Sequence, residues 1–201
     1  ISDLLTKIRN NRFVAITGQR GIGKSSLLQS GLIPKLQQGF TGIAGSKWRC
    51  AVCTPGLNPI ANLANALSGQ NVLGGGQAVT PDYSLEVEQT LLSRGQGLID
   101  AYQTSNITNE NLLVVINSFE DLFRYQSFNP DVQKDDTSNL LIYINLLLQA
   151  SREKDTAIYV IISLDENYKR VEKLDLICNP YVLTMTIYLI LGELITSYGR
   201  E

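Results

Sequence analysis

The chain has 201 residues, enough for one α/β domain or two small ones with a sizeable core. Hydrophobic residues make up 44% and charged residues 18%, and the formal net charge is −2, so the composition does not point to disorder, nucleic-acid binding or a membrane protein. There is no histidine, which excludes catalytic triads built on His, His-ligated metals and imidazole pH switches. Acid–base chemistry therefore has to use carboxylates, lysine or water.

The three cysteines are Cys50, Cys53 and Cys178, an odd number that argues against a disulfide framework and for a reducing, cytoplasmic compartment. The C-x-x-C spacing of the first two fits metal or redox sites, but one further cysteine and no histidine cannot complete a four-ligand zinc site. Both lie in an apolar run that is typical of a buried strand. We interpret them as core residues.

The longest apolar stretch, Tyr181–Leu191, is shorter than the ~20 residues of a membrane-spanning helix, so we expect it to belong to a core. The sequence begins at Ile1 without a basic region leading into an apolar segment. We expect residues 1–201 to form a single domain that is part of a longer protein.

Four short apolar runs rich in β-branched residues predict buried strands. They lie at residues 12–17, 48–54, 112–116 and 157–162. The run Leu112–Ile116 has no polar alternation, as expected for a parallel strand covered by helices on both faces.

Helical patterns separate these runs, at residues 25–33, 59–67, 84–102 and after Thr137. We expect Pro34 to kink or end the first helix, Asn58 to cap the second with Pro59 at its first position, and the third to be less regular around Gly95 and Gly97. Residues 68–81, with three consecutive glycines, are predicted to be a flexible surface loop. The expected buried stripes are Ile60, Leu63, Ala64 and Leu67 in the second helix, and Leu140, Leu141, Ile144, Leu147 and Leu148 in the last. Strands that alternate with helices predict a doubly wound, mostly parallel α/β sheet with helices on both faces.

One motif carries chemistry. Residues 18–25 read Gly-Gln-Arg-Gly-Ile-Gly-Lys-Ser, which fits the P-loop pattern G-x-x-x-x-G-K-[ST] and lies between a predicted strand and a predicted helix. Glycines let backbone N–H groups wrap a phosphate that a Cβ would keep away, while Lys24 reaches the β- and γ-phosphates and the Ser25 hydroxyl ligates Mg²⁺. The expected nucleotide-binding residues are Gly18, Gln19, Arg20, Gly21, Ile22, Gly23, Lys24, Ser25 and Ser26.

A P-loop site usually has an acid after a second strand, facing the metal. Here the strand Leu112–Ile116 is followed by Asn117, whose amide oxygen accepts a hydrogen bond from a metal-bound water but carries no charge. We therefore expect Ser25 and Asn117 to face Mg²⁺, with reduced metal affinity. Glu120 and Asp121 follow closely and are, with Asn117, the catalytic candidates; the alternative is that they are the solvated acidic start of a helix.

These residues resemble a known family. The segment Gly21–Leu36 reads G-I-G-K-S-S-L-L-Q-S-G-L-I-P-K-L and resembles the P-loop and first helix of the bacterial novel STAND NTPases. The resemblance continues through Trp48, the Pro55-Gly56 pair and Pro59, and through the segment Leu112–Phe123. It implies a P-loop NTPase fold of the ASCE type in which Phe13–Thr17 is central, Ile158–Ile162 flanks it and Leu112–Ile116 lies beyond.

The resemblance also implies a function. It points to an ATP- and Mg²⁺-dependent switch of signalling or antiviral defence proteins, in which ATP binding favours self-association and hydrolysis resets it. Sensor and effector domains are then expected outside these residues. Two positions depart from the family pattern: Asn117 replaces an aspartate, and Ser163 replaces an arginine, while Asp165 keeps an acid. We expect slow or absent turnover with preserved binding.

The sequence leaves one alternative function open, a nucleotide-binding scaffold that does not hydrolyse ATP. Four other functions have less support. The segment Leu73–Gln77 resembles an ABC-transporter signature but lies too far before the strand Leu112–Ile116, so we interpret it as a glycine loop. No N-K-x-D motif of GTPases occurs, a small-molecule kinase would rest on fold analogy alone, and the scattered Lys and Arg residues give nucleic-acid binding little support.

Overall fold

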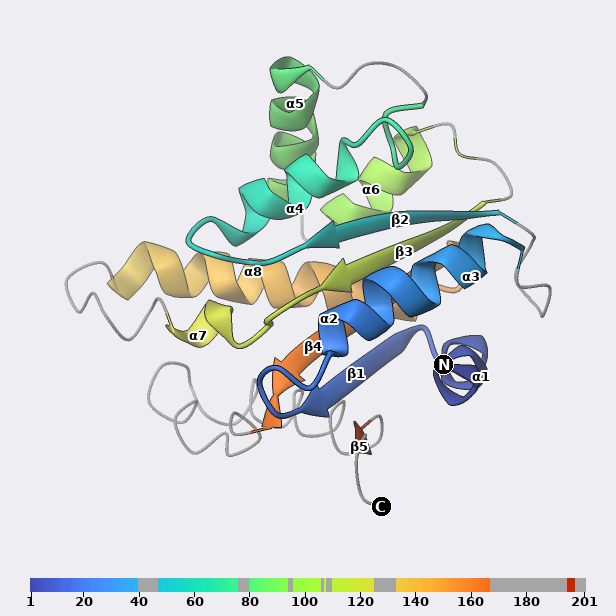
Figure 1. The fold of residues 1–201 in the computed structure, drawn as a ribbon. Coiled ribbons are helices and arrows are strands. Elements are labelled where there is room, and N and C mark those ends of the chain that lie inside the picture. Colours follow the sequence, from blue (N-terminus) through green and yellow to red (C-terminus); the bar gives the residue numbers. More distant parts are fainter. Residues whose placement is uncertain are drawn as a thin grey trace.

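The computed structural model describes residues 1–39, 47–75, 80–93, 96–105, 107, 110–124, 133–166 and 195–197 (Figure 1). Its centre is a five-stranded sheet with the order β2-β3-β4-β1-β5, and the strand pairs are parallel. The strands are β1 (Phe13–Gly18), β2 (Trp48–Cys53), β3 (Asn111–Ile116), β4 (Ile158–Asp165) and β5 (Ile195–Ser197). The predicted run Tyr181–Leu191 and Cys178 lie outside the described residues.

The register of the sheet places β4 between the other two central strands. Phe13 of β1 pairs with Val160 and Gly18 with Asp165, while Leu112 of β3 pairs with Ile158. The predicted neighbours of β1 and β3 are thus confirmed. Among the described strands the middle one is β4 rather than β1, because the short β5 alone lies beyond β1 there.

Helices cover both faces of the sheet, which confirms the predicted doubly wound class. They are α1 (Ser2–Asn10), α2 (Lys24–Ser26), η1 (Leu27–Leu32), α3 (Ile33–Gln37), α4 (Pro59–Leu67), α5 (Pro81–Leu92), α6 (Gly97–Thr104), α7 (Asp121–Arg124) and α8 (Gln133–Arg152). Figure 1 shows α2 and α3 on one face of the sheet and α8 on the other. We call these the P-loop-helix face and the α8 face.

Alternating strand residues build a separate core on each face. Ala15, Val114 and Ile162 pack among the α4, α6 and α8 side chains on the α8 face. Ile16, Val115 and Ile161 pack with the apolar residues of α1, η1 and α3 on the P-loop-helix face. Since both faces are buried, β1 and β3 carry the apolar runs Phe13–Ile16 and Leu112–Ile116, as the sequence pattern predicted.

The helix after the P-loop differs from its prediction. The helical run continues past Pro34 to Gln37, so Pro34 does not end it. The six residues before α3 form a π-helical turn, and Pro34 falls in the first turn of α3, where its missing N–H interrupts no α-helical bond.

The predicted helix 84–102 is wrong as a single element, because the chain forms α5 and α6 instead. Ser93 ends α5 in an extended conformation, with ψ of 121°. A Cβ on Gly97 would lie 2.2 Å from the Thr90 carbonyl oxygen and 2.5 Å from the Leu91 Cα. Only glycine therefore lets α6 begin directly against the backbone of α5.

The predicted surface loop 68–81 is also corrected in part. Val72 and Leu73 are buried in the α8-face core, and the Leu73 N–H donates to the Leu67 carbonyl at 3.0 Å. Asn58 precedes α4 and Pro59 is its first residue, as predicted, although the Asn58 side chain makes no capping bond. The predicted stripe of α4 is buried; in α8 the stripe is buried except at Leu141, which is half-buried, and α8 begins earlier than predicted.

The two cysteines of the C-x-x-C pair point to opposite faces of β2. Cys50 packs against the P-loop-helix-face core, and Cys53 packs against the α8-face core, 3.9 Å from the buried Tyr143 hydroxyl. Both are free and half-buried, and burial raises the pKa of each thiol to about 11. The spacing therefore brings no metal or redox pair together.

Candidate nucleotide site

Buried polar residues gather at one end of the sheet. Eight polar or charged residues are buried within the described part of the chain, and five of them lie at or just beyond the carboxyl ends of β1, β3 and β4. These five are Thr17, Asn117, Glu120, Ser163 and Asp165. Burying polar groups costs free energy unless they are bonded, so such a concentration marks a site rather than a core.

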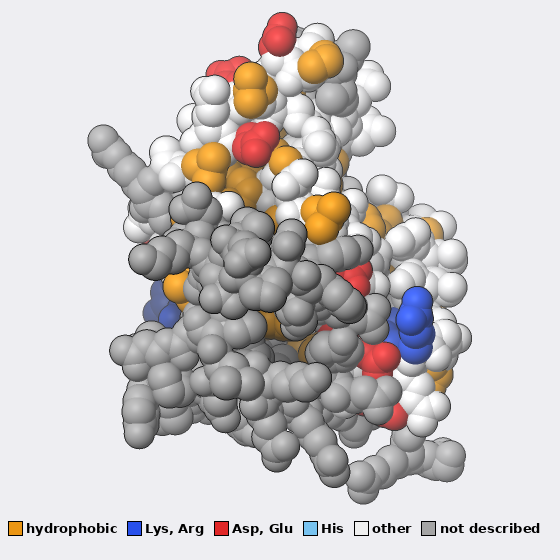
Figure 2. Space-filling view, turned by 90° about the vertical axis from the view of Figure 1, so that its left-hand side faces the viewer, with side chains coloured by type: hydrophobic (Ala, Val, Ile, Leu, Met, Phe, Trp, Pro, Cys, Tyr) orange, Lys and Arg blue, Asp and Glu red, His pale blue; other side chains and the backbone are white. Residues whose placement is uncertain are grey.

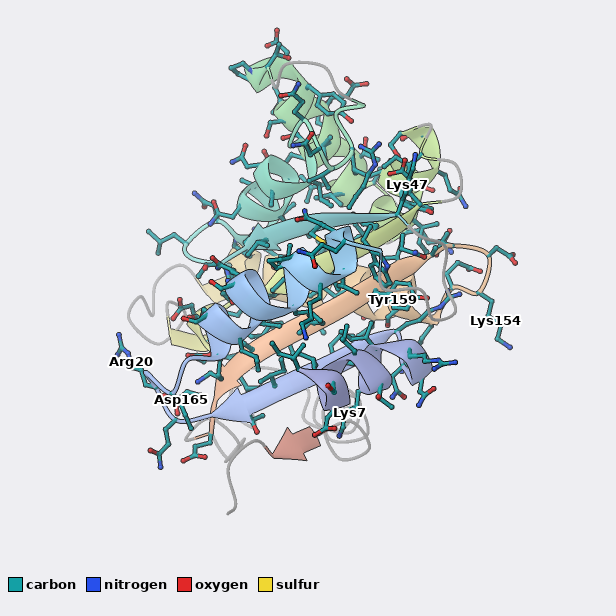
Figure 3. The ribbon with its side chains drawn as sticks, turned by 45° about the vertical axis from the view of Figure 1, so that its right-hand side comes forward. Lys7, Arg20, Lys47, Lys154, Tyr159 and Asp165 are labelled. Carbon is teal, nitrogen blue, oxygen red and sulfur yellow. The ribbon has the colours of Figure 1, made fainter. Side chains whose placement is uncertain are left out.

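The P-loop lies at the same end. Gly18 closes β1, and residues 19–23 are exposed. Figure 3 shows Arg20 and Asp165 at this end, whereas Lys154 and Tyr159 lie at the opposite one. Figure 2 looks toward this end and shows basic and acidic side chains next to each other at its right-hand side.

The loop conformation explains its glycines. Gly21 and Gly23 have φ of 83° and 96°, a left-handed backbone that other residues adopt at a cost. A Cβ on either would meet nothing within 4 Å, so conformation rather than crowding requires glycine there. The same exposed backbone leaves room for a ligand on the loop.

Lys24 is fixed across the loop. Its ammonium donates to the carbonyl oxygens of Gly18 at 2.6 Å and Gln19 at 2.9 Å. An ammonium group has three protons, so one remains for a further acceptor. Ser25 and Ser26 follow on α2 and are exposed. The predicted nucleotide-binding residues therefore form one continuous loop with a positive charge held over it.

Asn117 is buried directly after β3, with 6% of its surface exposed. Its backbone N–H donates to the Cys53 carbonyl at 2.8 Å, but its Oδ1 atom has no hydrogen-bond partner. The Thr17 Oγ1 atom, at the end of β1, is also buried without a partner. The unpartnered Asn117 oxygen, on the face that carries the P-loop helix, fits a missing polar ligand such as a metal-bound water, whereas Thr17 lies two strands away on the other face.

The turn after Asn117 is tied to the end of β4. Ser118 has φ of 50°, unusual for a residue other than glycine. Its N–H donates to the Ser163 Oγ at 3.3 Å, and the Phe119 N–H donates to the Ser163 carbonyl at 2.8 Å. The Asp165 N–H donates to Glu120 Oε2 at 3.2 Å. Ser163, where the family resemblance implies arginine, thus holds the turn that carries Asn117.

The structure brings Asn117 and Glu120 to the end of the sheet where the P-loop lies, while Asp121 begins α7 and is half-buried. Two further residues of this end were outside the predicted site. The family pattern indicates Asp165 only as an acid, and no motif in the sequence points to Thr17. Both stand at the last or second-last position of a parallel strand, which is the signal that could have found them.

A family model for Novel STAND NTPase 1 matches residues 1–176. The chain belongs to this family. The family assigns an NTPase module and therefore nucleotide binding, and it confirms the resemblance that Gly21–Leu36 and Leu112–Phe123 indicated.

Two solved structures are similar over most of this STAND NTPase chain. One is the ORC2 protein of Aeropyrum pernix in its ADPNP–ADP complexes, with 13% identity and a TM-score of 0.42, covering 82% of this chain and 38% of that one. The other is the HORMA:CdnC:Trip13 complex of E. coli MS115-1, with 15% identity and a TM-score of 0.36, covering 84% and 48%. The chain thus spans less than half the length of either structure's chain. No curated protein matches the sequence.

Two features of the described residues bear on metal ions and on membranes. Nowhere in these residues do three or more Cys, Asp or Glu side chains gather in a way that could hold a metal ion. Magnesium is usually bound through one or two carboxylates together with substrate phosphates, so a cage made only of protein side chains is not required. None of the helices described has the length and hydrophobicity to cross a bilayer.

Proposed function

We propose that this STAND NTPase module binds ATP with Mg²⁺ at Gly18–Ser26 and acts as a cytoplasmic, nucleotide-controlled switch of self-association in signalling or defence. The observation that carries the binding proposal is the exposed loop with left-handed Gly21 and Gly23, closed by a lysine that two loop carbonyls hold in place. Its position at the carboxyl end of a parallel sheet is where such folds bind their ligands.

The roles of the loop residues follow from their positions. In this proposal the loop residues 19–23, which are exposed, donate backbone N–H groups to the β-phosphate, except for Ile22, whose N–H donates to the Gln19 carbonyl. Lys24 donates its remaining proton to a β- or γ-phosphate oxygen. The Ser25 hydroxyl and the Asn117 Oδ1 atom face the metal. Bound Mg²⁺ supplies charge that neutralises the phosphate oxygens.

Slow turnover is the second part of the proposal. Asn117 offers no charge to the metal, and Ser163 offers none to the transferred phosphate. Glu120 orients the attacking water, with Oε2 anchored by the Asp165 N–H, and Asp121 lies next to it at the start of α7. Binding depends less on these residues, because the loop and Lys24 hold the phosphates.

The switch itself rests on the family. Sensor and effector domains lie outside residues 1–201 in this proposal, and these residues form one domain. ATP favours a homo-oligomer and ADP the monomer. The competing candidate is a nucleotide-binding scaffold without turnover, which the two substitutions at Asn117 and Ser163 favour.

The binding experiment compares ATP affinity by calorimetry in the wild type, Lys24→Ala and Lys154→Ala. Loss of the Lys24 ammonium removes a hydrogen bond to a charged group, so affinity should fall by ~1.5–3 kcal/mol, roughly ten- to 150-fold. Lys154 lies at the opposite end of the sheet, so its variant serves as the matched control (Figure 3). Equal affinity in the wild type and Lys24→Ala contradicts the proposal.

The same samples test the switch. Light scattering after size exclusion should give a larger mass with ATP than with ADP for the wild type, and no such difference for Lys24→Ala. A mass that is the same with both nucleotides contradicts the switch while leaving nucleotide binding intact.

A further inference from the structure

We infer that Asp165, at the end of β4, is the carboxylate that faces the nucleotide-bound metal in this chain, in place of the acid missing at Asn117. The inference rests on the proposed function, since it concerns a metal that arrives with ATP. It assigns the metal-side charge to a different strand from the one that the sequence motif indicates.

The first argument is the register of the sheet. Asp165 pairs with Gly18, the first residue of the P-loop, on the strand next to β1. Asn117 follows β3, which is two strands from β1. With neighbouring strands ~4.8 Å apart, the Asp165 backbone lies about 5 Å from the base of the P-loop across the sheet, against about 10 Å for the strand of Asn117. An acid on β4 is therefore closer to the phosphates than an acid on β3.

The second argument is the face on which the side chain emerges. Successive residues of a strand point to opposite faces. In β4, Ile162 and Leu164 pack in the α8-face core and Ile161 in the P-loop-helix-face core. The alternation places Ser163 and Asp165 with Ile161, on the face that carries Lys24 and Ser25 at the start of α2.

The third argument is the burial of polar atoms around this position. Asp165 is 5% exposed, and the Asn117 Oδ1 atom, after the neighbouring strand β3, is buried without a partner. By the same alternation Asn117, which follows Ile116, lies on the P-loop-helix face with Asp165, so a metal ion with its water on this face gives the Asn117 oxygen a partner.

Glu120 has a positioning role in this arrangement. Its Oε2 accepts the Asp165 N–H at 3.2 Å, so the backbone from which the Asp165 side chain leaves is fixed to the turn that carries Asn117. The carboxylate of Asp165 and the amide of Asn117 are thereby held in one rigid unit at the end of β3 and β4.

The experiment measures ATP affinity in Mg²⁺ and in EDTA, and takes the ratio as the metal enhancement. Wild type should show an enhancement, and Asp165→Asn should lose about tenfold or more of it, the effect of one charge-assisted contact, while its affinity in EDTA stays at the wild-type value. Glu166→Gln, which removes the neighbouring charge, is the control and should keep the enhancement. Preserved affinity in EDTA also shows that Asp165→Asn is folded.

A second variant exchanges the two side chains. Asp165→Asn combined with Asn117→Asp returns an acid to β3 and should recover most of the metal enhancement. The inference is overturned if Asp165→Asn keeps the wild-type ratio, if the wild type has no metal enhancement, or if the exchange variant stays as low as a folded Asp165→Asn. ATP binding that is absent from the wild type, or unaffected by Lys24→Ala, refutes the proposed function instead, so the two failures are distinguishable.

Discussion

Replacing Asn117 by aspartate changes one charge at the metal side of the site and almost nothing in shape. The side chain is 6% exposed and its Oδ1 lacks a partner, so the variant keeps the packing and adds a carboxylate at the position where the family resemblance implies one. We expect ATP hydrolysis to rise by about a hundredfold, because one preorganised electrostatic contact in an active site contributes on the order of 3 kcal/mol.

The same substitution should destabilise the protein without ligand. The side chain at position 117 is almost fully buried, and the Glu120 and Asp165 side chains are buried at the same end of the sheet. A buried polar group without a partner costs ~1–3 kcal/mol, and more when it is charged. In a chain of this size each kcal/mol lowers Tm by roughly 2–4 °C, so Tm should fall by several degrees without nucleotide and recover with Mg²⁺ and ATP.

Steady-state phosphate release and thermal unfolding of the two proteins decide the matter. A variant that carries both Asn117→Asp and Lys24→Ala controls for contaminating ATPase and should release no phosphate above background. Brisk turnover in the wild type, or no gain in Asn117→Asp, would show that the missing charge at position 117 is not what limits hydrolysis. An unchanged Tm without ligand would show that position 117 is more hydrated than its burial indicates.

Two further predictions concern the fold. In a Cys178→Ser background, Cys50 and Cys53 should react with iodoacetamide at pH 8 about a hundredfold more slowly than free cysteine, because burial raises their pKa from an ordinary 9.0 to about 11. Since the folded state holds these protons more tightly, its stability should fall as the pH rises from 9 to 11, which urea unfolding at each pH measures. Gly97→Ala should lower stability by ~1–3 kcal/mol or more, since its Cβ would overlap the α5 backbone, whereas Gln96→Ala at an exposed position should not.

The sequence was sufficient for those parts of the fold that depend on local composition. The apolar runs at β1 and β3 could be assigned as strands because both faces of a parallel strand are buried, so no alternation confuses them with other elements. The P-loop followed from the spacing of its glycines, which Gly21 and Gly23 justify by their left-handed backbone. The pairing of β1 with β4 required the family resemblance, because strand order is not a local property.

The remaining features depend on contacts between distant residues. The break between α5 and α6 follows from the packing of Gly97 on Thr90 and Leu91, and helical periodicity alone does not reveal it. Val72 and Leu73 are buried because their turn folds back on the end of α4, although the segment is rich in glycine. In the site, the role of Asp165 depends on its register with Gly18, which no spacing along the chain encodes.

The two departures from the family pattern, Asn117 and Ser163, are coupled through one hydrogen bond, and this coupling yields a last prediction. The Ser163 Oγ accepts the Ser118 N–H at 3.3 Å, directly after Asn117, in a turn where Ser118 has a φ of 50°. Arginine has no acceptor atom, so Ser163→Arg leaves that N–H without its partner and forces a long side chain into a position that is 1% exposed.

Restoring the arginine alone should therefore lower stability by at least ~1–3 kcal/mol, the cost of one unsatisfied buried group, and should not raise hydrolysis. Ser163→Ala, which removes the acceptor without adding bulk, separates the lost hydrogen bond from the overpacking. Urea unfolding and phosphate release, measured for both variants and the wild type, compare their stabilities and their rates of hydrolysis. A stable and more active Ser163→Arg protein would mean that the turn carrying Asn117 does not need Ser163, and that the serine arose independently of the asparagine.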